Sequence, residues 1–201
     1  MITGKRYKIA RRLGPSVFDK TQGKKFALRQ DTKAGGKFKR AGSDFGLQLI
    51  EKQRAKVTYG VNERQFKTLV QTIIEKRPAN LGEALVAALE MRLDNAVYRL
   101  GLAATRQAAR QMVSHGHIDV NGKRQSIPSA RVEVGDTIAV RPGSAKKGVF
   151  NGLDERLKET KVPSWLSLDA EKKTAKVQGV PKLAQNELAF DLSQIFQYYS
   201  K

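Results

Sequence analysis

The sequence predicts an α+β fold that combines mostly helical segments with a small region of short strands. Apolar residues recur with a roughly 3.6-residue period through much of residues 43–100, which is typical of helices that bury one side. From Ile118 onward apolar and polar residues alternate, and Asn121-Gly122 is the strongest short signal for a tight β-hairpin turn. A last helix is expected near the C-terminus, with a buried side formed by Leu192, Ile195, Phe196 and Tyr199.

The composition points to a polyanionic partner. The 201 residues include 38 Lys or Arg and 19 Asp or Glu, which leaves a formal net charge of +19. Such an excess of positive charge is typical of proteins that bind nucleic acids. A membrane surface is the competing partner, but no apolar run approaches the roughly 20 residues that span a bilayer, and the first residues lack the apolar region of a secretory signal. We therefore expect a cytoplasmic protein without a membrane partner.

Several kinds of catalytic and metal site are excluded by the residues themselves. Cysteine is absent, which rules out disulfides, thiolate catalysis and thiolate zinc sites. His115 and His117 can share a metal ion, but no nearby cysteine or paired acid supplies the remaining ligands, so a polar helix end is the preferred interpretation. The sequence contains no P-loop, serine-hydrolase elbow or zinc-protease motif. We expect no catalytic residue, no metal and no cofactor.

The first segment, residues 1–42, is predicted to be a basic arm. Residues 1–40 hold 13 Lys or Arg and two acids, and Gly35-Gly36 breaks any helix there. A solvated tail is one interpretation, whereas an arm that becomes ordered on RNA as it neutralises phosphates fits the charge better. The RNA-binding residues expected in the arm are Arg11, Arg12, Lys39 and Arg40.

Residues 43–91 are predicted to form helices. The helix after Ser43 is expected to keep a basic outer side and to pack through Phe45, Leu49 and Ile50. Asn62 and Gln65 form a capping box for the next helix, which Pro78 ends. The apolar stripe of that helix consists of Phe66, Leu69, Val70, Ile73 and Ile74. The RNA contacts expected in this region are Lys52, Arg54, Lys56 and Arg64.

A further helix is expected to begin at Asn80, which forms a capping box with Glu83. If it runs directly into the helix at Arg92, one long helix joins two regions of the chain, and they behave as one rigid body. The Arg92 helix ends at Gly101, which tolerates a positive φ, and its apolar stripe consists of Leu93, Ala96, Val97 and Leu100. Arg92 and Arg99 lie largely off that stripe and are expected to contact RNA.

The next helix is predicted to begin at Thr105, whose hydroxyl can accept from the free N–H groups of the first turn. Arg106 and Arg110 share one face, where equal charges gain nothing from each other, so an anionic partner is expected. Gly116 ends this helix, and the hairpin that follows has a basic edge. The residues of this unit expected to reach phosphate or 2′-OH groups are Thr105, Arg106, Arg110, Gln111, Ser114, His115, Asn121, Lys123 and Arg124.

The chain up to residue 178 is expected to complete a small mixed domain. An extended piece from Ile127 to Val134 and a strand that contains Ile138 and Val140 follow the hairpin. A helix is predicted from Ser144 to Glu159. Trp165 is the only tryptophan, and a core anchor is the preferred interpretation over a base-stacking residue.

The stretch RLDNAVYRLGLAATRQAARQMVSHGHIDVNGKR, residues 92–124, resembles the RNA-binding domain of the S-four family of bacterial small-subunit ribosomal proteins. SDFGLQLIEKQRAKVTYGVNERQF from Ser43 and PSWLSLD from Pro163 resemble further parts of that family. Many members carry a cysteine zinc knuckle near the N-terminus, which this chain cannot form. The resemblance implies a discontinuous helical domain with an inserted S-four-type RNA-binding domain, their limits being residues 43–91 completed by 179–201, and residues 92–178.

The resemblance also implies a function. Members of the family bind small-subunit rRNA directly at a multi-helix junction of the 5′ domain and nucleate assembly. They contact neighbouring small-subunit proteins, lie near the channel by which mRNA enters, and influence decoding accuracy. We therefore expect a non-enzymatic rRNA-binding protein of the ribosome. The residues themselves favour recognition by shape, in which basic side chains pin the backbones of converging RNA helices.

Two alternatives remain open. Arg92-Leu93-Asp94 resembles a catalytic triplet of pseudouridine synthases that carry this RNA-binding domain, but here it lacks the following Thr and Gly and lies within an amphipathic helix. Asp94 is instead expected to form an ion pair on the helix surface, for instance with Arg92 or Arg99. The other alternative is an RNA-binding regulator outside the ribosome, which fractionation of a lysate would separate from ribosomal subunits.

Overall fold

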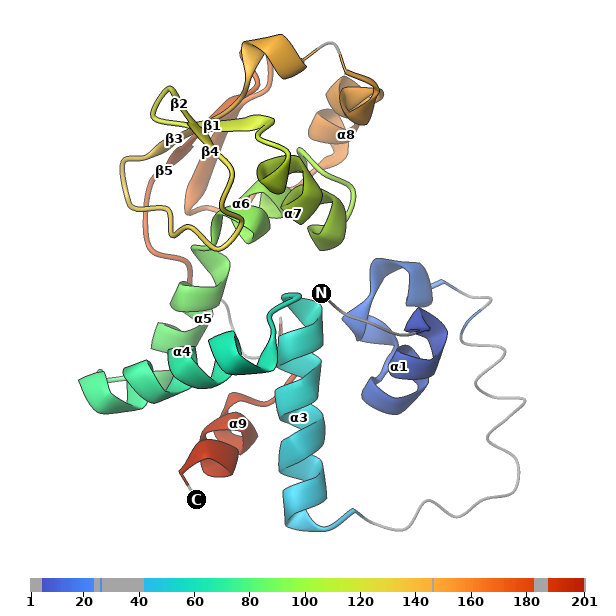
Figure 1. The fold of residues 1–201 in the computed structure, drawn as a ribbon, viewed down its shortest axis with the longest axis vertical. Coiled ribbons are helices and arrows are strands. Elements are labelled where there is room, and N and C mark those ends of the chain that lie inside the picture. Colours follow the sequence, from blue (N-terminus) through green and yellow to red (C-terminus); the bar gives the residue numbers. More distant parts are fainter. Residues whose placement is uncertain (1–4, 24–25, 27–41, 146, 183–187, 201) are drawn as a thin grey trace. The chain divides into compact units, whose positions relative to one another are not determined.

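The computed structural model describes residues 5–23, 26, 42–145, 147–182 and 188–200, which belong to two compact units (Figure 1). Unit 1 comprises Met1–Leu85 and Leu183–Lys201, and unit 2 comprises Val86–Lys182. The described part of unit 1 is helical, and unit 2 combines helices with one sheet, so the predicted α+β class is confirmed. Within the described residues, no helix combines the length and the apolar character needed to cross a bilayer.

Side-chain caps begin several helices of unit 1. The side chain of Ser43 accepts from the N–H of Gly46 at 3.3 Å, and that of Asn62 accepts from the N–H of Gln65 at 2.8 Å. Asn80 likewise accepts from the N–H of Glu83, so the caps predicted at Asn62 and Asn80 are confirmed. The helices that lie wholly or partly in unit 1 are α1 (Arg6–Leu13), α3 (Asp44–Thr58), α4 (Glu63–Lys76), α5 (Leu81–Glu90) and α9 (Leu192–Tyr199).

The C-terminal helix α9 returns to pack on α3. The backbone N–H of Asp191 donates to Glu51 Oε2 at 3.0 Å, and the ring of Phe190 meets the ring of Tyr59 edge to face. This arrangement confirms the discontinuous helical domain that the family resemblance implies. Phe45, which the sequence predicts to pack, stacks its ring on that of Tyr198 but remains 54% exposed.

Antiparallel strands form a five-stranded sheet in unit 2. Its order is β2-β1-β3-β5-β4, which places β2 and β4 at opposite edges. Val120 pairs with Lys123, and Asn121 and Gly122 have φ of 52° and 74°, so the predicted tight hairpin turn is confirmed. The strands are β1 (Ile118–Val120), β2 (Lys123–Gln125), β3 (Thr137–Val140), β4 (Leu166–Asp169) and β5 (Thr174–Val177).

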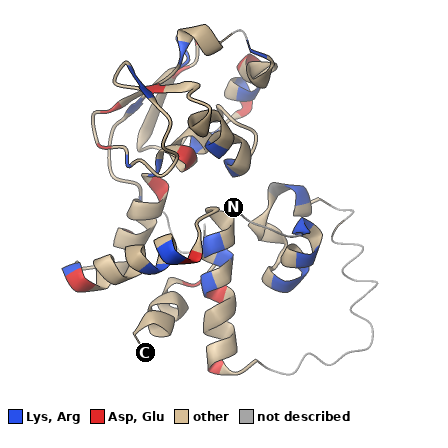
Figure 2. Cartoon of the chain, in the orientation of Figure 1, with Lys and Arg blue, Asp and Glu red and all other residues tan. Residues whose placement is uncertain are grey.

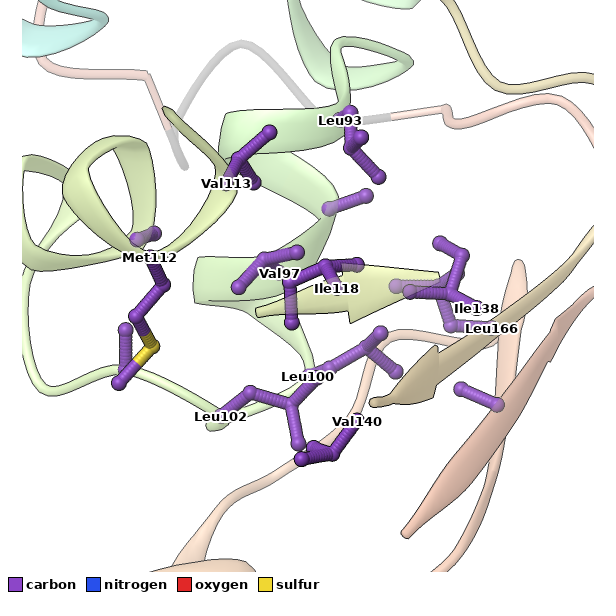
Figure 3. Packing of buried hydrophobic residues seen from close by; sticks show 14 of the residues in the cluster. Leu93, Val97, Leu100, Leu102, Met112, Val113, Ile118, Ile138, Val140 and Leu166 are labelled. Atoms are coloured by element: carbon purple, nitrogen blue, oxygen red, sulfur yellow. The ribbon is translucent and has the colours of Figure 1, made fainter. Parts of the chain in front are cut away.

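One hydrophobic core joins this sheet to the helices α6 (Leu93–Arg99), α7 (Arg106–Ser114) and α8 (Leu153–Glu159). Figure 3 shows Leu93 and Val97 of α6, Leu100 just after that helix, and Met112 and Val113 of α7 around Ile118, Ile138, Val140 and Leu166 of the sheet. Buried and less buried residues alternate along β3, so one face of the strand meets the core. Trp165 is buried in the same core, which confirms its predicted role as an anchor.

The single long helix considered for residues 80–100 is not formed. The chain leaves the helical conformation between α5 and α6, where Arg92 is extended with ψ of 138° and pairs with Arg131 in an isolated β-bridge. The N–H of Val132 also donates to the carbonyl of Met91 at 2.9 Å. A contact between residues that are distant in sequence therefore overrides the local helical pattern.

The segment from Ile127 to Val134 was predicted as an extended piece, but its only strand pairing is the bridge at Arg131. Instead, its backbone carbonyls accept hydrogen bonds from the first turn of α6. The N–H of Leu93 donates to the carbonyl of Ala130 at 2.8 Å, and that of Asp94 donates to the carbonyl of Pro128 at 3.0 Å. Backbone carbonyls thus satisfy the free N–H groups that every helix leaves in its first turn.

The prediction of one helix from Ser144 to Glu159 was wrong. The structure has 3-10 turns at Pro142–Ser144 and Gly148–Phe150, and a regular helix only in α8. Asn151 is extended and Gly152 has a φ of 68°, which ends any helix that approaches from the N-terminal side. Of the apolar residues expected to face inward here, Phe150, Leu153 and Leu157 are buried, whereas Val149 is 49% exposed.

The close packing around one glycine can be tested by comparison with a second glycine that has the same φ. Gly101 and Gly122 both have a φ of 74°, but an added Cβ would clash with the side chain of Thr160 at Gly101 and would meet nothing within 4 Å at Gly122. A left-handed backbone costs a residue with a side chain about 1–2 kcal/mol. We expect Gly122→Ala to cost about that amount, and Gly101→Ala at least about 1 kcal/mol more because of the clash.

Urea unfolding followed by the fluorescence of Trp165 measures both variants, because this only tryptophan lies in unit 2. Equal losses of stability in the two variants would contradict the crowding at Gly101.

Candidate nucleic-acid interface

Helix α7 begins at a side-chain cap and buries one face. Thr105 Oγ1 accepts from the N–H of Ala108 at 3.1 Å, as the sequence predicts. The buried face consists of Ala109, Met112 and Val113, which belong to the core of unit 2. Gln111 and Ser114 are exposed on the same helix, and His115 is exposed just after it. The cap and the core therefore fix which polar groups of α7 face solvent.

Asp94 lies at the start of α6 in a buried cluster. Arg92 binds it through two hydrogen bonds, from Nε to Oδ1 at 3.1 Å and from Nη2 to Oδ2 at 2.8 Å. Arg110 of α7 reaches the same carboxylate at 3.6 Å. The side chain of Asp94 is only 5% exposed, so the expectation of an ion pair on the helix surface is corrected to a buried one. Both carboxylate oxygens bind arginine, which gives Asp94 a structural role.

Glu90 is a second buried carboxylate, and sequence reasoning missed it. Its side chain is fully buried and accepts two hydrogen bonds from Arg99, each at 2.8 Å. It also accepts from Asn95 Nδ2 at 2.8 Å, while Asn95 Oδ1 accepts from Arg106 Nε at 2.9 Å. The guanidinium of Arg106 lies over the ring of Tyr98 at 4.4 Å. One carboxylate at the end of α5 thus orients arginines of both α6 and α7.

The hairpin is fixed by the side chain of Asn121. Its Nδ2 donates to Asp136 Oδ1 at 2.7 Å, and its Oδ1 accepts from the N–H of Thr137 at 2.9 Å. Lys123 and Arg124 follow on β2, and both are exposed. With the hairpin tip held by its own hydrogen bonds, these two cations are presented on an ordered edge of the sheet.

His117 is a buried histidine beside this basic edge. Its Nδ1 lies 3.0 Å from Ser144 Oγ, and its ring meets that of Phe150 edge to face. Burial lowers the pKa of His117 below the ordinary value of 6.5, and the positive charge of Lys147 lowers it further. The neutral imidazole is therefore favoured in the fold.

Lys52 of α3 points into unit 1, although the sequence placed it on an outer basic side. Its side chain is 5% exposed, donates to Glu63 Oε1 at 2.7 Å and lies 4.3 Å from the ring centre of Tyr198. Lys56 donates to the other oxygen of Glu63 at 3.0 Å. Burial tends to raise the pKa of Glu63, but the bonds from both lysines outweigh it and the pKa falls below its ordinary value. Lys52 of α3 thus links that helix to α4 and α9 through contacts inside unit 1.

The predicted RNA-binding residues fall into two groups. Those whose side chains are exposed are Arg11, Arg12, Arg64, Gln111, Ser114, His115, Asn121, Lys123 and Arg124. Within this exposed group, Arg11, Ser114, Asn121 and Arg124 also form hydrogen bonds inside the protein. Those held by contacts within the protein are Lys52, Arg54, Lys56, Arg92, Arg99, Thr105, Arg106 and Arg110. Lys39 and Arg40 lie outside the described residues. Contact with RNA stays a prediction for all of them. Figure 2 shows how Lys and Arg residues recur along α1 and α3.

Two family models match the chain. The one described as the S4 domain matches residues 91–138, and the one described as the ribosomal protein S4/S9 N-terminal domain matches residues 1–90. The first match covers α6, α7 and the hairpin, which are the elements that carry the buried arginine cluster and the basic edge.

Similar proteins include those named small ribosomal subunit protein uS4 from a Roseiflexus species, Herpetosiphon aurantiacus and Lactiplantibacillus plantarum. They are 42%, 42% and 41% identical to this chain. The alignments cover 96%, 99% and 99% of this chain and 96%, 98% and 98% of the relatives. The similarity therefore extends through both units.

Removing the charge of Glu90 should destabilise unit 2. Glu90→Gln keeps the shape of the side chain but leaves Arg99 without its carboxylate. Breaking a buried pair costs about 3–5 kcal/mol, and we expect about 2–3 kcal/mol here because Arg99 retains some contact with solvent. Urea unfolding followed by Trp165 fluorescence measures the loss. Glu159→Gln, at an exposed glutamate of α8, is the control and should change stability by less than about 0.5 kcal/mol.

The buried His117 should make unit 2 less stable in mild acid. Above pH 6.5 the imidazole is neutral in the folded and the unfolded chain. Below that value the unfolded chain binds the proton more readily than the folded chain, so stability falls as the pH drops. We expect this slope to begin as the pH falls through 6.5, in the parent and in His115→Gln, the control at the exposed histidine, but a flatter one in His117→Gln. Parallel slopes in all three proteins would contradict the burial argument.

Proposed function

Because the chain belongs to the family of small ribosomal subunit protein uS4, we propose that it is a structural, non-enzymatic constituent of the small ribosomal subunit that binds rRNA. The observation that carries the proposal is the coincidence of two findings. The S4-domain match falls on residues 91–138, and these residues present ordered basic and amide side chains on α7 and the hairpin. Such a component acts in the cytoplasm, within the ribosome.

The geometry supports recognition of RNA by shape. Exposed cations on the hairpin can neutralise phosphates, and the exposed Gln111 and Ser114 can donate to phosphate or accept from a 2′-OH. Double-stranded RNA offers side chains little sequence information in its deep major groove, so the spacing of backbones becomes the signal. A surface whose side chains are held in place binds RNA backbones of the matching spacing more tightly, because its side chains lose less conformational freedom on binding.

The buried carboxylates contribute by holding arginines in fixed orientations. Arg110 is bound at Asp94 but its side chain remains 35% exposed, and Arg106 is half-buried between Asn95 and the Tyr98 ring. In the described part of the chain, Arg92, Arg99, Arg106 and Arg110 lie in one cluster with Glu90 and Asp94. Because the Arg110 side chain stays partly exposed, its guanidinium can also meet a phosphate group beside α7.

The family resemblance supports finer proposals. The rRNA site is a multi-helix junction of the 5′ domain, and binding there nucleates assembly of that part of the subunit. The protein also contacts neighbouring small-subunit proteins, lies near the channel by which mRNA enters, and contributes to translational accuracy. Chemical footprinting of the protein on naked small-subunit rRNA tests the first of these, since protection should centre on the junction.

The basic edge of the sheet should contribute more to rRNA affinity than an equal charge elsewhere on unit 2. Lys123→Gln/Arg124→Gln removes two exposed cations from β2, and Lys172→Gln/Lys176→Gln removes two from the opposite side of the sheet. We expect the first variant to bind small-subunit rRNA at least about tenfold more weakly. Its slope of log K against log salt should also become shallower by about 0.7–0.9 for each phosphate that the protein no longer neutralises.

Filter binding at several salt concentrations measures both quantities. The charge-matched control variant should stay within about twofold of the parent, because only its net charge changes. Equal weakening in the two variants would mean that total charge, and not the hairpin, governs binding.

A further inference from the structure

A hollow beside the first helix is lined mainly by Lys and Arg residues, and the surface that they and their neighbours present to it is mostly apolar. Helix α1 and the 3-10 turn at Asp19–Thr21 enclose about 620 Å³, within the range of about 300–1,000 Å³ typical of ligand sites. We call it the α1 hollow, and its lining residues are Lys5, Arg6, Tyr7, Lys8, Arg11, Lys20 and Thr21. Among the described residues that line it, five are positively charged and none is acidic, which favours an anionic occupant.

The one aromatic residue that lines the α1 hollow is held in a fixed position. The ring of Tyr7 stacks on that of Phe26, with centroids 5.9 Å apart and an angle of 24° between the planes. Phe26 is buried, whereas Tyr7 is 45% exposed. The backbone carbonyl of Tyr7 also accepts from Arg11 Nε at 3.2 Å. A supported aromatic ring that remains accessible is the form that base-stacking residues take.

The wall opposite α1 is also ordered. Thr21 is buried, and its hydroxyl donates to the carbonyls of Pro15 and Phe18, which lie 2.7 Å and 2.8 Å away. Leu13 at the end of α1 packs with Val17 in a small buried cluster. The α1 hollow is therefore shaped by internal hydrogen bonds and packing, not by the cations that line it.

We propose that the α1 hollow binds one nucleotide of a single-stranded RNA segment, with its base stacked on Tyr7 and its phosphates beside the surrounding Lys and Arg side chains. The proposal rests on the proposed function, to which it adds an unpaired segment as a second kind of RNA target. A single strand is required because a base inside a duplex has no free face to stack on a protein ring. Phosphate attraction and base stacking together distinguish this ligand from a polyanion without bases.

The test uses the full chain and a fluorescently labelled oligouridylate of roughly ten nucleotides, whose binding is followed by anisotropy. Stacking contributes enough that Tyr7→Leu should weaken binding by about tenfold. Tyr7→Phe keeps the ring and should stay within about twofold of the parent. Phe45→Leu is the matched control, because Phe45 is also an exposed ring stacked on another ring but does not line the α1 hollow.

Heparin, a polyanion without bases, separates stacking from charge and from folding. Tyr7→Leu should bind heparin like the parent, and the salt dependence of oligouridylate binding should keep its slope because the phosphate contacts remain. Oligouridylate affinity of Tyr7→Leu within about twofold of the parent would overturn the proposal, as would an equal loss for heparin. A failure to prefer folded small-subunit rRNA over an arbitrary duplex would instead overturn the proposed function, and it would leave the oligouridylate result intact.

Discussion

The fold of unit 2 depends on two carboxylates that are buried together with arginines. Glu90 and Asp94 lie at either side of the break between α5 and α6, and they bind Arg99 and Arg92 through paired hydrogen bonds. A charge is stable in a protein interior only when a partner compensates it, so the backbone must bring acid and base within bonding distance. The β-bridge at Arg92 and the carbonyl caps of α6 meet this requirement. The positions of the α7 arginines follow from it.

Local chemistry predicted most of the fold, and long-range contacts account for what it missed. The caps at Asn62, Asn80 and Thr105 and the hairpin at Asn121-Gly122 depend on neighbouring residues, and each is found where the sequence places it. The break after α5 depends on a pairing with residues some distance along the chain, which periodicity cannot detect. Strand β5 was not anticipated, since TAKV is too short to stand out without its partners β3 and β4.

The candidate site was predictable as a region but not residue by residue. Sequence reasoning weighed Lys52 and Arg64 alike, yet Lys52 is buried against Glu63 and Tyr198 whereas Arg64 is exposed. The signal that could have revealed Glu90 is its place on the apolar side of α5, directly after Leu89. A carboxylate in such a position requires a buried cation. Cations are abundant in this chain, so the sequence alone does not say which one it binds.

The position of β2 at the edge of the sheet has a consequence for the protein before it meets any partner. An edge strand exposes unpaired backbone groups that a second copy of the chain can join, which leads to aggregation. Here that edge carries Lys123 and Arg124, and two such edges repel each other. The charges proposed to meet phosphates thus also keep newly made molecules apart. The positive charges of β2 oppose self-association until an anion neutralises them. An anion as large as RNA then also covers the exposed edge of β2.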